Sequence, residues 1–217
     1  MKINGRNPVN RPSQSRLGSP TNRPSTRNRH RALLVRPLVL ALAVAGAPAV
    51  ALGTASTSTA ATCATTTAGW GSVTKSVDRM TTAPITNVRA GRQACFDRMV
   101  VDLRGRSAGF SVRYVTRVLT EGEGAVIPLR GGAKLEVIVR APAYDINTGR
   151  PTYNPRNPRE LANVAGFSTF RQIAFGGSFE AQTTVGLGVR ARLPMRAVLV
   201  NGPGTGSRLV IDVAHRW

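Results

Sequence analysis

From Pro84 onward, apolar and polar residues alternate with a period of two, and this alternation constrains the fold more than any other feature of the chain. Successive side chains of a strand point to opposite faces, so alternation indicates strands with one buried face. Gly and Pro interrupt the pattern at intervals of about eight to fifteen residues, as turns between antiparallel strands would. The sequence therefore predicts an all-β fold: a β-sandwich or partly open barrel of about eight mostly antiparallel strands with one short helix.

Eight segments carry the strand pattern. The expected strands span residues 85–90, 94–104, 109–118, 134–140, 168–175, 179–192, 196–201 and 207–215. The short helix is expected where Asn157 can act as N-cap, Pro158 suits the first turn, and Glu160 can complete a capping box. Residues 141–158 contain four prolines and are expected to form a long surface loop.

The N-terminal residues have the composition of an export signal. Basic residues between Arg23 and Arg31 precede an apolar run from Leu38 to Leu52, and small residues follow it. A membrane anchor is the alternative, but Pro and Gly within the run leave it short of the roughly 20 apolar residues that a span needs. We expect residues 1–53 to be a signal peptide with a long basic leading region, leaving no transmembrane span after processing. Residues 54–69, rich in Thr, Ala and Ser, are expected to be a disordered linker to a domain at 70–217.

The chain has two cysteines, Cys63 and Cys95. An even count in an exported protein favours a disulfide, which would join the linker to the first long strand and contribute roughly 3 to 4 kcal/mol. The alternative is a lipid on Cys63. A lipidated cysteine requires a lipobox directly after the apolar run. Thr62 and the Thr/Ser-rich stretch between the apolar run and Cys63 fit that motif badly.

An internal repeat links the first and last long strands. The segment Arg98-Met-Val-Val-Asp102-Leu recurs as Arg208-Leu-Val-Ile-Asp212-Val. In each copy the Arg, the central Val and the Asp share one face of the strand, and the other apolar residues face the core. If the two strands are antiparallel neighbours, Arg98 can oppose Asp212 and Asp102 can oppose Arg208, adding up to about 1 kcal/mol per pair.

The sequence resembles the AMIN-like domain proteins secreted by high-GC Gram-positive bacteria. The resemblance rests on five ordered segments, at residues 70–76 (WGSVTKS), 88–105, 141–145 (APAYD), 167–194 and 206–217. The namesake AMIN domain is a β-sandwich that directs periplasmic amidases and secretin components to the envelope by contact with peptidoglycan. The resemblance therefore implies a wall-associated binding module, in a secreted protein or lipoprotein.

Residue patterns for catalysis are weak. His215 is the one histidine after the leader, whereas a zinc site needs two or three with a carboxylate. A Ser–His–Asp system would need Ser178 or Ser207 beside His215, and neither serine lies in a strand-to-helix elbow. Glu160 and Glu180 would form a hydrolytic carboxylate pair only if the fold joined them. We expect no catalytic residue, metal or cofactor.

Candidate binding residues are arginines and tyrosines. Guanidinium groups on one face of a sheet could hold phosphate or carboxylate, and tyrosines in the long loop could stack on sugars; the alternative is a solvated polar face over a Phe-rich core. The candidates are Arg171, Arg190, Arg192, Arg196, Tyr144 and Tyr153.

The charge favours an anionic partner. The formal net charge is +20, and nine of the 30 Lys and Arg residues, with no Asp or Glu, lie within residues 1–51, so +11 remains beyond them. Nucleic acid would fit this charge but conflicts with export. The leading hypothesis is a secreted or envelope-associated, non-catalytic module that binds peptidoglycan or an anionic wall polymer. A module that binds another secreted protein and an unrecognised hydrolase are the alternatives.

Overall fold

The computed structural model describes residues 59–106 and 108–217. The predicted signal peptide and the first five residues of the predicted linker lie outside the described residues. The rest of the chain forms one helix, α1 (Thr59–Thr66), and eleven strands. The strands are β1 (Lys75–Val77), β2 (Ile85–Arg92), β3 (Phe96–Leu103), β4 (Phe110–Val115), β5 (Val118–Leu119), β6 (Val126–Ile127), β7 (Ala133–Val139), β8 (Phe170–Phe179), β9 (Gln182–Val189), β10 (Met195–Asn201) and β11 (Ser207–Ala214).

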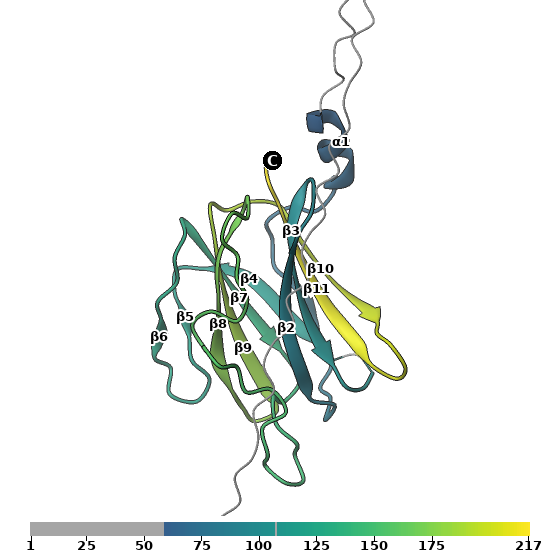
Figure 1. The fold of residues 1–217 in the computed structure, drawn as a ribbon, viewed down its shortest axis with the longest axis vertical. Coiled ribbons are helices and arrows are strands. Elements are labelled where there is room, and N and C mark those ends of the chain that lie inside the picture. The colour runs from purple at the N-terminus through teal and green to yellow at the C-terminus, as the bar shows by residue number, and fades with distance from the viewer. Residues whose placement is uncertain (1–58, 107) are drawn as a thin grey trace, which may run out of the picture. The chain divides into compact units, whose positions relative to one another are not determined.

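Two antiparallel sheets pack face to face (Figure 1). The five-stranded sheet has the order β1-β4-β7-β9-β8, and the four-stranded sheet has the order β10-β11-β3-β2. A small third sheet pairs β5 with β6. The predicted all-β sandwich is confirmed.

The core lies between the two large sheets. In β3 and β11 the inward residues alternate as the repeat predicts, and Met99, Val101, Ile211 and Val213 are fully buried. Val185, Leu187 and Val189 of β9 face them from the other sheet. Burying such side chains stabilises the fold by roughly 1.5 to 3 kcal/mol each.

Several strand boundaries differ from the prediction. The segment 109–118 divides into β4 and β5, and the short strands β1, β5 and β6 were missed. The strands around Phe179 meet in a tight hairpin whose two turn residues, Glu180 and Ala181, both have positive φ. Neither turn position is Gly or Asn, the residues that usually indicate such a turn, so the prediction placed the boundary between these two strands too early.

The predicted helix after Asn157 is wrong. Asn157 does bond through its side chain to the amide of Arg159, but only one turn forms. The segment then pairs with the edge of β8, because Leu161 N–H donates to Ile173 O and Phe175 N–H donates to Pro158 O. These bonds take the backbone groups that a helix would have needed. The helix of the described residues is α1 instead, inside the predicted linker.

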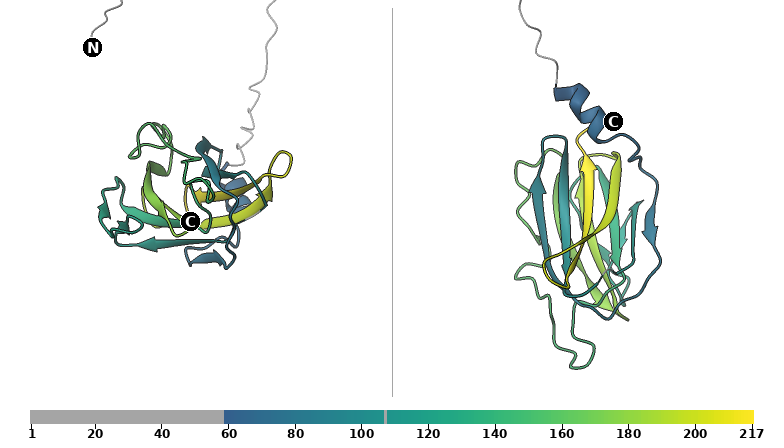
Figure 2. Two further views of the ribbon diagram at one scale, coloured as in Figure 1. Left: turned by 90° about the horizontal axis from the view of Figure 1, so that it is seen from below. Right: turned by 90° about the vertical axis from the view of Figure 1, so that its right-hand side faces the viewer.

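The sandwich has two distinct ends. The disulfide end comprises α1, residues 67–72 and 93–96, residues 190–195 and the C-terminal residues 214–217. Here Cys63 and Cys95 form the predicted disulfide, and the C-terminus lies beside α1 (Figure 2). The turn end comprises residues 78–84, 104–106 and 108–109, the tip of the long loop near residues 145–150, and the β10–β11 turn at residues 202–206.

The outer faces of the two sheets are covered to different degrees. The β5–β6 pair folds over the five-stranded sheet, where Val118 and Ile127 pack on Ala174 in a second small core. A glycine in β9 makes room for this layer: a Cβ on Gly186 would lie 2.8 Å from the side chain of Leu129, which packs against the second core. Within the described residues, no such pair of strands folds over the four-stranded sheet. None of these residues forms a helix with the length and apolar character needed to cross a membrane.

Candidate functional site

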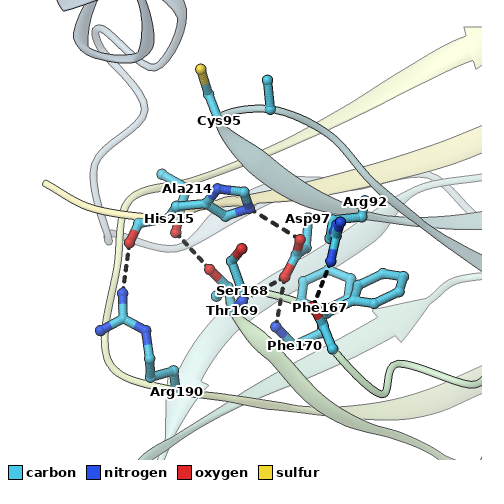
Figure 3. A network of polar contacts seen from close by, with 12 residues as sticks. Arg92, Cys95, Asp97, Phe167, Ser168, Thr169, Phe170, Arg190, Ala214 and His215 are labelled. Carbon is cyan, nitrogen blue, oxygen red and sulfur yellow. Dashed lines mark hydrogen bonds and ion pairs between the residues drawn. The ribbon is translucent and has the colours of Figure 1, made fainter. Parts of the chain in front are cut away.

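A buried carboxylate organises the disulfide end (Figure 3). Asp97 has no exposed surface, and its Oδ2 accepts hydrogen bonds from the backbone amides of Thr169, at 2.6 Å, and Phe170, at 2.9 Å. Its Oδ1 lies 3.1 Å from Nε2 of His215. One side chain of β3 thus fixes the start of β8 and the residue that follows β11.

The residues around Asp97 hold one another through backbone groups. His215 donates its amide hydrogen to Cys95 O and accepts from Arg190 at 2.6 Å, while the Thr169 hydroxyl donates to Ala214 O. Arg92 donates to Gly166 O at 2.8 Å. The network ties β3, β8 and the C-terminus to the disulfide, which is the arrangement of a structural clamp.

The candidate catalytic groups are held apart. Ser178 bonds to Gln182 O and to Thr183, and Ser207 bonds to Gly105 O, whereas His215 faces Asp97. Glu160 pairs with Arg130 at 2.6 Å. Within residues 59–106 and 108–217, no group of three His, Cys, Asp or Glu side chains gathers to hold a metal.

The outer face of the four-stranded sheet carries the internal repeat. Strands β3 and β11 are antiparallel neighbours, with Arg98 opposite Asp212 and Asp102 opposite Arg208, the register expected from the repeat. Asp212 accepts two hydrogen bonds from Arg98, at 2.7 and 2.9 Å, and one from Arg196 of β10, at 2.8 Å. The sequence did not predict the third member of this group.

Aromatic rings cover the Asp212 group. Arg196 lies 4.7 Å from the ring centre of Trp70, and Arg98 lies 5.1 Å from that of Phe96. The two rings also pack on each other, with centroids 5.3 Å apart. This cover leaves the Asp212 side chain with no exposed surface, although it lies on the outer face of the sheet.

The Asp102 group is similar but more open. Asp102 accepts two hydrogen bonds from Arg89 of β2, at 2.8 and 3.0 Å, and one from Arg208, at 3.2 Å. Its side chain is 23% exposed. Burial alone would raise the pKa of Asp102, but the hydrogen bonds and charges of Arg89 and Arg208 together lower it below its ordinary value.

These two groups leave the outer face cationic. Each aspartate is shared by two arginines, so four arginines face two carboxylates. Between the groups lies a row of valines, of which Val198 is 37% exposed while Val100 and Val210 are buried. The face therefore combines unbalanced positive charge with a narrow apolar centre, which suits an anionic partner.

The arginines singled out from the sequence are engaged within the chain. Arg190 bonds to His215 O, Arg192 bonds to Ser72 and lies over Tyr114, and Arg196 belongs to the Asp212 group. Arg171 donates to the carbonyl oxygens of Phe167 and Phe170. Arg190, Arg192 and Arg196 thus join separate segments, whereas Arg171 bonds within its own segment, and a binding role for the four stays a prediction.

The two tyrosines of the long loop also contact the domain. The Tyr144 hydroxyl accepts a hydrogen bond from the amide of Ala181, and the Tyr153 ring meets Phe175 edge to face, with centroids 5.8 Å apart. Burial raises the pKa of Tyr153 to about 12. Stacking of either ring on a sugar stays a prediction.

Sequence reasoning missed Asp97 and the arginines of the turn end. Asp97 precedes Arg98 in β3 and shares the inward face with Met99, so a carboxylate in an apolar row was the available signal for a buried polar group. Arg104 and Arg106 flank Gly105 directly after β3. In a sequence, two arginines beside a turn glycine look the same whether they bind a ligand or are simply solvated.

Comparison with known proteins gives one family. Residues 83–215 match the family described as the AMIN-like domain. The match begins just before β2 and includes every strand from β2 to β11. A search of curated proteins gives no match to the chain.

Proposed function

The match covers more than half of the chain, which therefore belongs to the AMIN-like domain family, and we propose that it acts as an exported, non-catalytic module that attaches to the cell envelope. The family is a non-enzymatic one associated with the cell wall. The ligand in this proposal is peptidoglycan or an anionic wall polymer. The disulfide supports export, because such bonds persist in oxidising compartments.

The observation that carries the proposal is the set of arginines on the outer face of the four-stranded sheet. Four arginines there share two carboxylates, and the sheet lacks the β5–β6 layer that covers the other one. A rigid sheet that presents guanidinium groups can bind carboxylates or phosphates without ordering new backbone. Envelope polymers carry these groups in long repeats.

Cosedimentation with purified sacculi tests the proposal. The oxidised protein is mixed with sacculi at about 150 mM NaCl and centrifuged, and the bound fraction is measured again at about 1 M NaCl. We expect binding at the lower salt concentration and release at the higher one, because exposed guanidinium groups are screened by salt. A protein that remains in the supernatant at physiological salt contradicts the proposal.

Binding to another secreted protein is the second candidate function. Strand β10 is an edge of the four-stranded sheet, and Val198 and Val200 are 37% and 40% exposed on it. An extended segment of a partner could pair with such an edge. Val198→Lys with Val200→Lys would block capture of a partner from culture supernatant, whereas sedimentation with sacculi should be kept or strengthened, because both substitutions add positive charge to a cationic face. Capture that persists in this variant would exclude this candidate.

A further inference from the structure

Two hollows flank the β10–β11 turn at residues 202–206. The first has a volume of about 490 Å³ and is lined by Arg79, Arg106 and the turn itself. The second has a volume of about 720 Å³ and is lined by the other side of the turn together with Arg89, Arg104 and Arg208. The turn thus forms a ridge between two arginine-lined hollows.

The charge of these hollows is strongly unbalanced. Five arginines line them, and Asp102 is the one acidic residue among the lining residues. Asp102 already binds Arg89 and Arg208. Arg104 and Arg106 are exposed, and neither guanidinium group makes a hydrogen bond or ion pair with another described residue. One unengaged guanidinium group therefore lies in each hollow.

Pro203 and Thr205 are the two residues of the ridge that carry side chains, and the other three are glycines. Two of these glycines are closely packed: a Cβ on Gly206 would lie 3.0 Å from Leu103 O, and one on Gly202 would lie 3.0 Å from the Gly206 backbone. Gly204 has a φ of +59°. A ligand can cross such a turn close to its backbone, reaching both hollows at once.

The lining chemistry favours phosphate over sugar. Neither hollow has an aromatic side chain in its lining, so neither offers a stacking platform for a sugar ring. Guanidinium groups match phosphate through paired hydrogen bonds. Two cationic hollows separated by a glycine-rich ridge fit a chain with repeated phosphates better than a single anion.

We propose that the turn end binds a phosphodiester-linked polyanion of the envelope, with successive phosphates held on the two sides of the 202–206 turn by Arg106 and Arg104. This deepens the proposed function by naming the polymer class. The gain comes from effective concentration, because a phosphate held in one hollow brings the next phosphate to the other.

A matched pair of double variants tests this site. Arg104→Gln with Arg106→Gln removes two positive charges from the turn end. Arg117→Gln with Arg216→Gln removes two exposed, unengaged arginines near the disulfide end and serves as the control. The probes are a purified poly(glycerol phosphate), monomeric glycerol phosphate and poly-glutamate of equal charge. Urea midpoints of both variants check that each is folded.

We expect poly(glycerol phosphate) to bind the unmodified protein, and the turn-end variant to bind it about 10-fold more weakly or worse, with less than about 2-fold change in the control. Monomeric glycerol phosphate and poly-glutamate should bind much more weakly. Equal weakening by the two variants, or equal affinity for poly-glutamate, would overturn the site.

Sacculi stripped of phosphodiester-linked polymers by hydrofluoric acid separate this inference from the proposed function. Loss of sedimentation after stripping supports both. If stripped sacculi still retain the protein as well as intact ones, envelope attachment stands and the phosphodiester site falls. If neither preparation retains it but the purified polymer binds and depends on Arg104 and Arg106, the site stands and envelope attachment falls.

Discussion

At the disulfide end, the side chains of Arg190 and Arg192 donate to backbone oxygens of His215 and Ser72, whereas at the turn end the side chains of Arg104 and Arg106 make no hydrogen bond to another described residue. The first pair joins segments that are distant in sequence. The second pair contributes nothing of that kind to the fold. Arg117 and Arg216 are also exposed and unengaged, so what distinguishes Arg104 and Arg106 is that they line two adjacent cationic hollows, where a ligand would offset the charge repulsion.

The internal repeat gives a second comparison between the same two ends. Strands β3 and β11 each contribute one residue of the repeat to each group, so the two arginine–aspartate groups have nearly the same composition. Asp212, near the disulfide end, is covered by Trp70 and Phe96, whereas Asp102, near the turn end, is 23% exposed. The same short motif thus acts as a buried fastening at one end and as part of an open cationic surface at the other.

The largest expected effect is the loss of the buried carboxylate at the disulfide end. Asp97→Ala leaves the amides of Thr169 and Phe170 buried without an acceptor, at a cost of about 3 to 5 kcal/mol in the free energy of unfolding. Urea unfolding followed by tryptophan fluorescence measures it. Asp97→Asn keeps an acceptor oxygen and should lose less. A loss below about 1 kcal/mol for Asp97→Ala would mean that the Asp97 network does not stabilise the disulfide end.

The matched variants Asp212→Asn and Asp102→Asn sharpen the comparison. We expect a loss of about 3 kcal/mol for Asp212, because two arginines remain beside a covered position without their counter-charge. Asp102 is partly solvated, and a loss of about 1 kcal/mol is expected there. Urea midpoints of the two variants give the difference directly. Equal losses would show that the aromatic cover has no energetic consequence.

Most of this fold could be predicted from the sequence. The period-two alternation predicts which residues of each strand face the core, and the repeat predicts which residues of two neighbouring strands oppose each other. The register of Arg98 against Asp212 follows once β3 and β11 are neighbours. The site was harder, because burial and partner choice depend on segments distant in sequence. Arg190, Arg192 and Arg196 lie close to Pro194 in the sequence and suggest a binding cluster. In the structure, however, these side chains bond to carbonyl oxygens and to Asp212. Arg104 and Arg106 look ordinary because their freedom is visible only in three dimensions.

Acid titration should affect the Asp102 group in a predictable direction. Its folded pKa is lowered, so this group contributes stability above the unfolded-state value of about 3.9, and that contribution is lost as pH falls through the folded pKa. Urea midpoints measured from about pH 6 down to about pH 2 for the unmodified protein and Asp102→Asn isolate the effect, which should be below about 1 kcal/mol. The prediction fails if the two proteins lose stability in parallel over that range.

The smallest expected effect on stability is at Arg104 and Arg106. Both side chains are exposed and unengaged, so Arg104→Gln with Arg106→Gln should change the free energy of unfolding by less than about 0.5 kcal/mol. Removal of two like charges from a cationic end could even raise it slightly, because five arginines gather there around one carboxylate. A neutral or raised urea midpoint, together with weakened binding of the phosphodiester polymer, would show that these two arginines serve the ligand and not the fold. A clear loss of stability would instead place them among the structural arginines, as at the disulfide end.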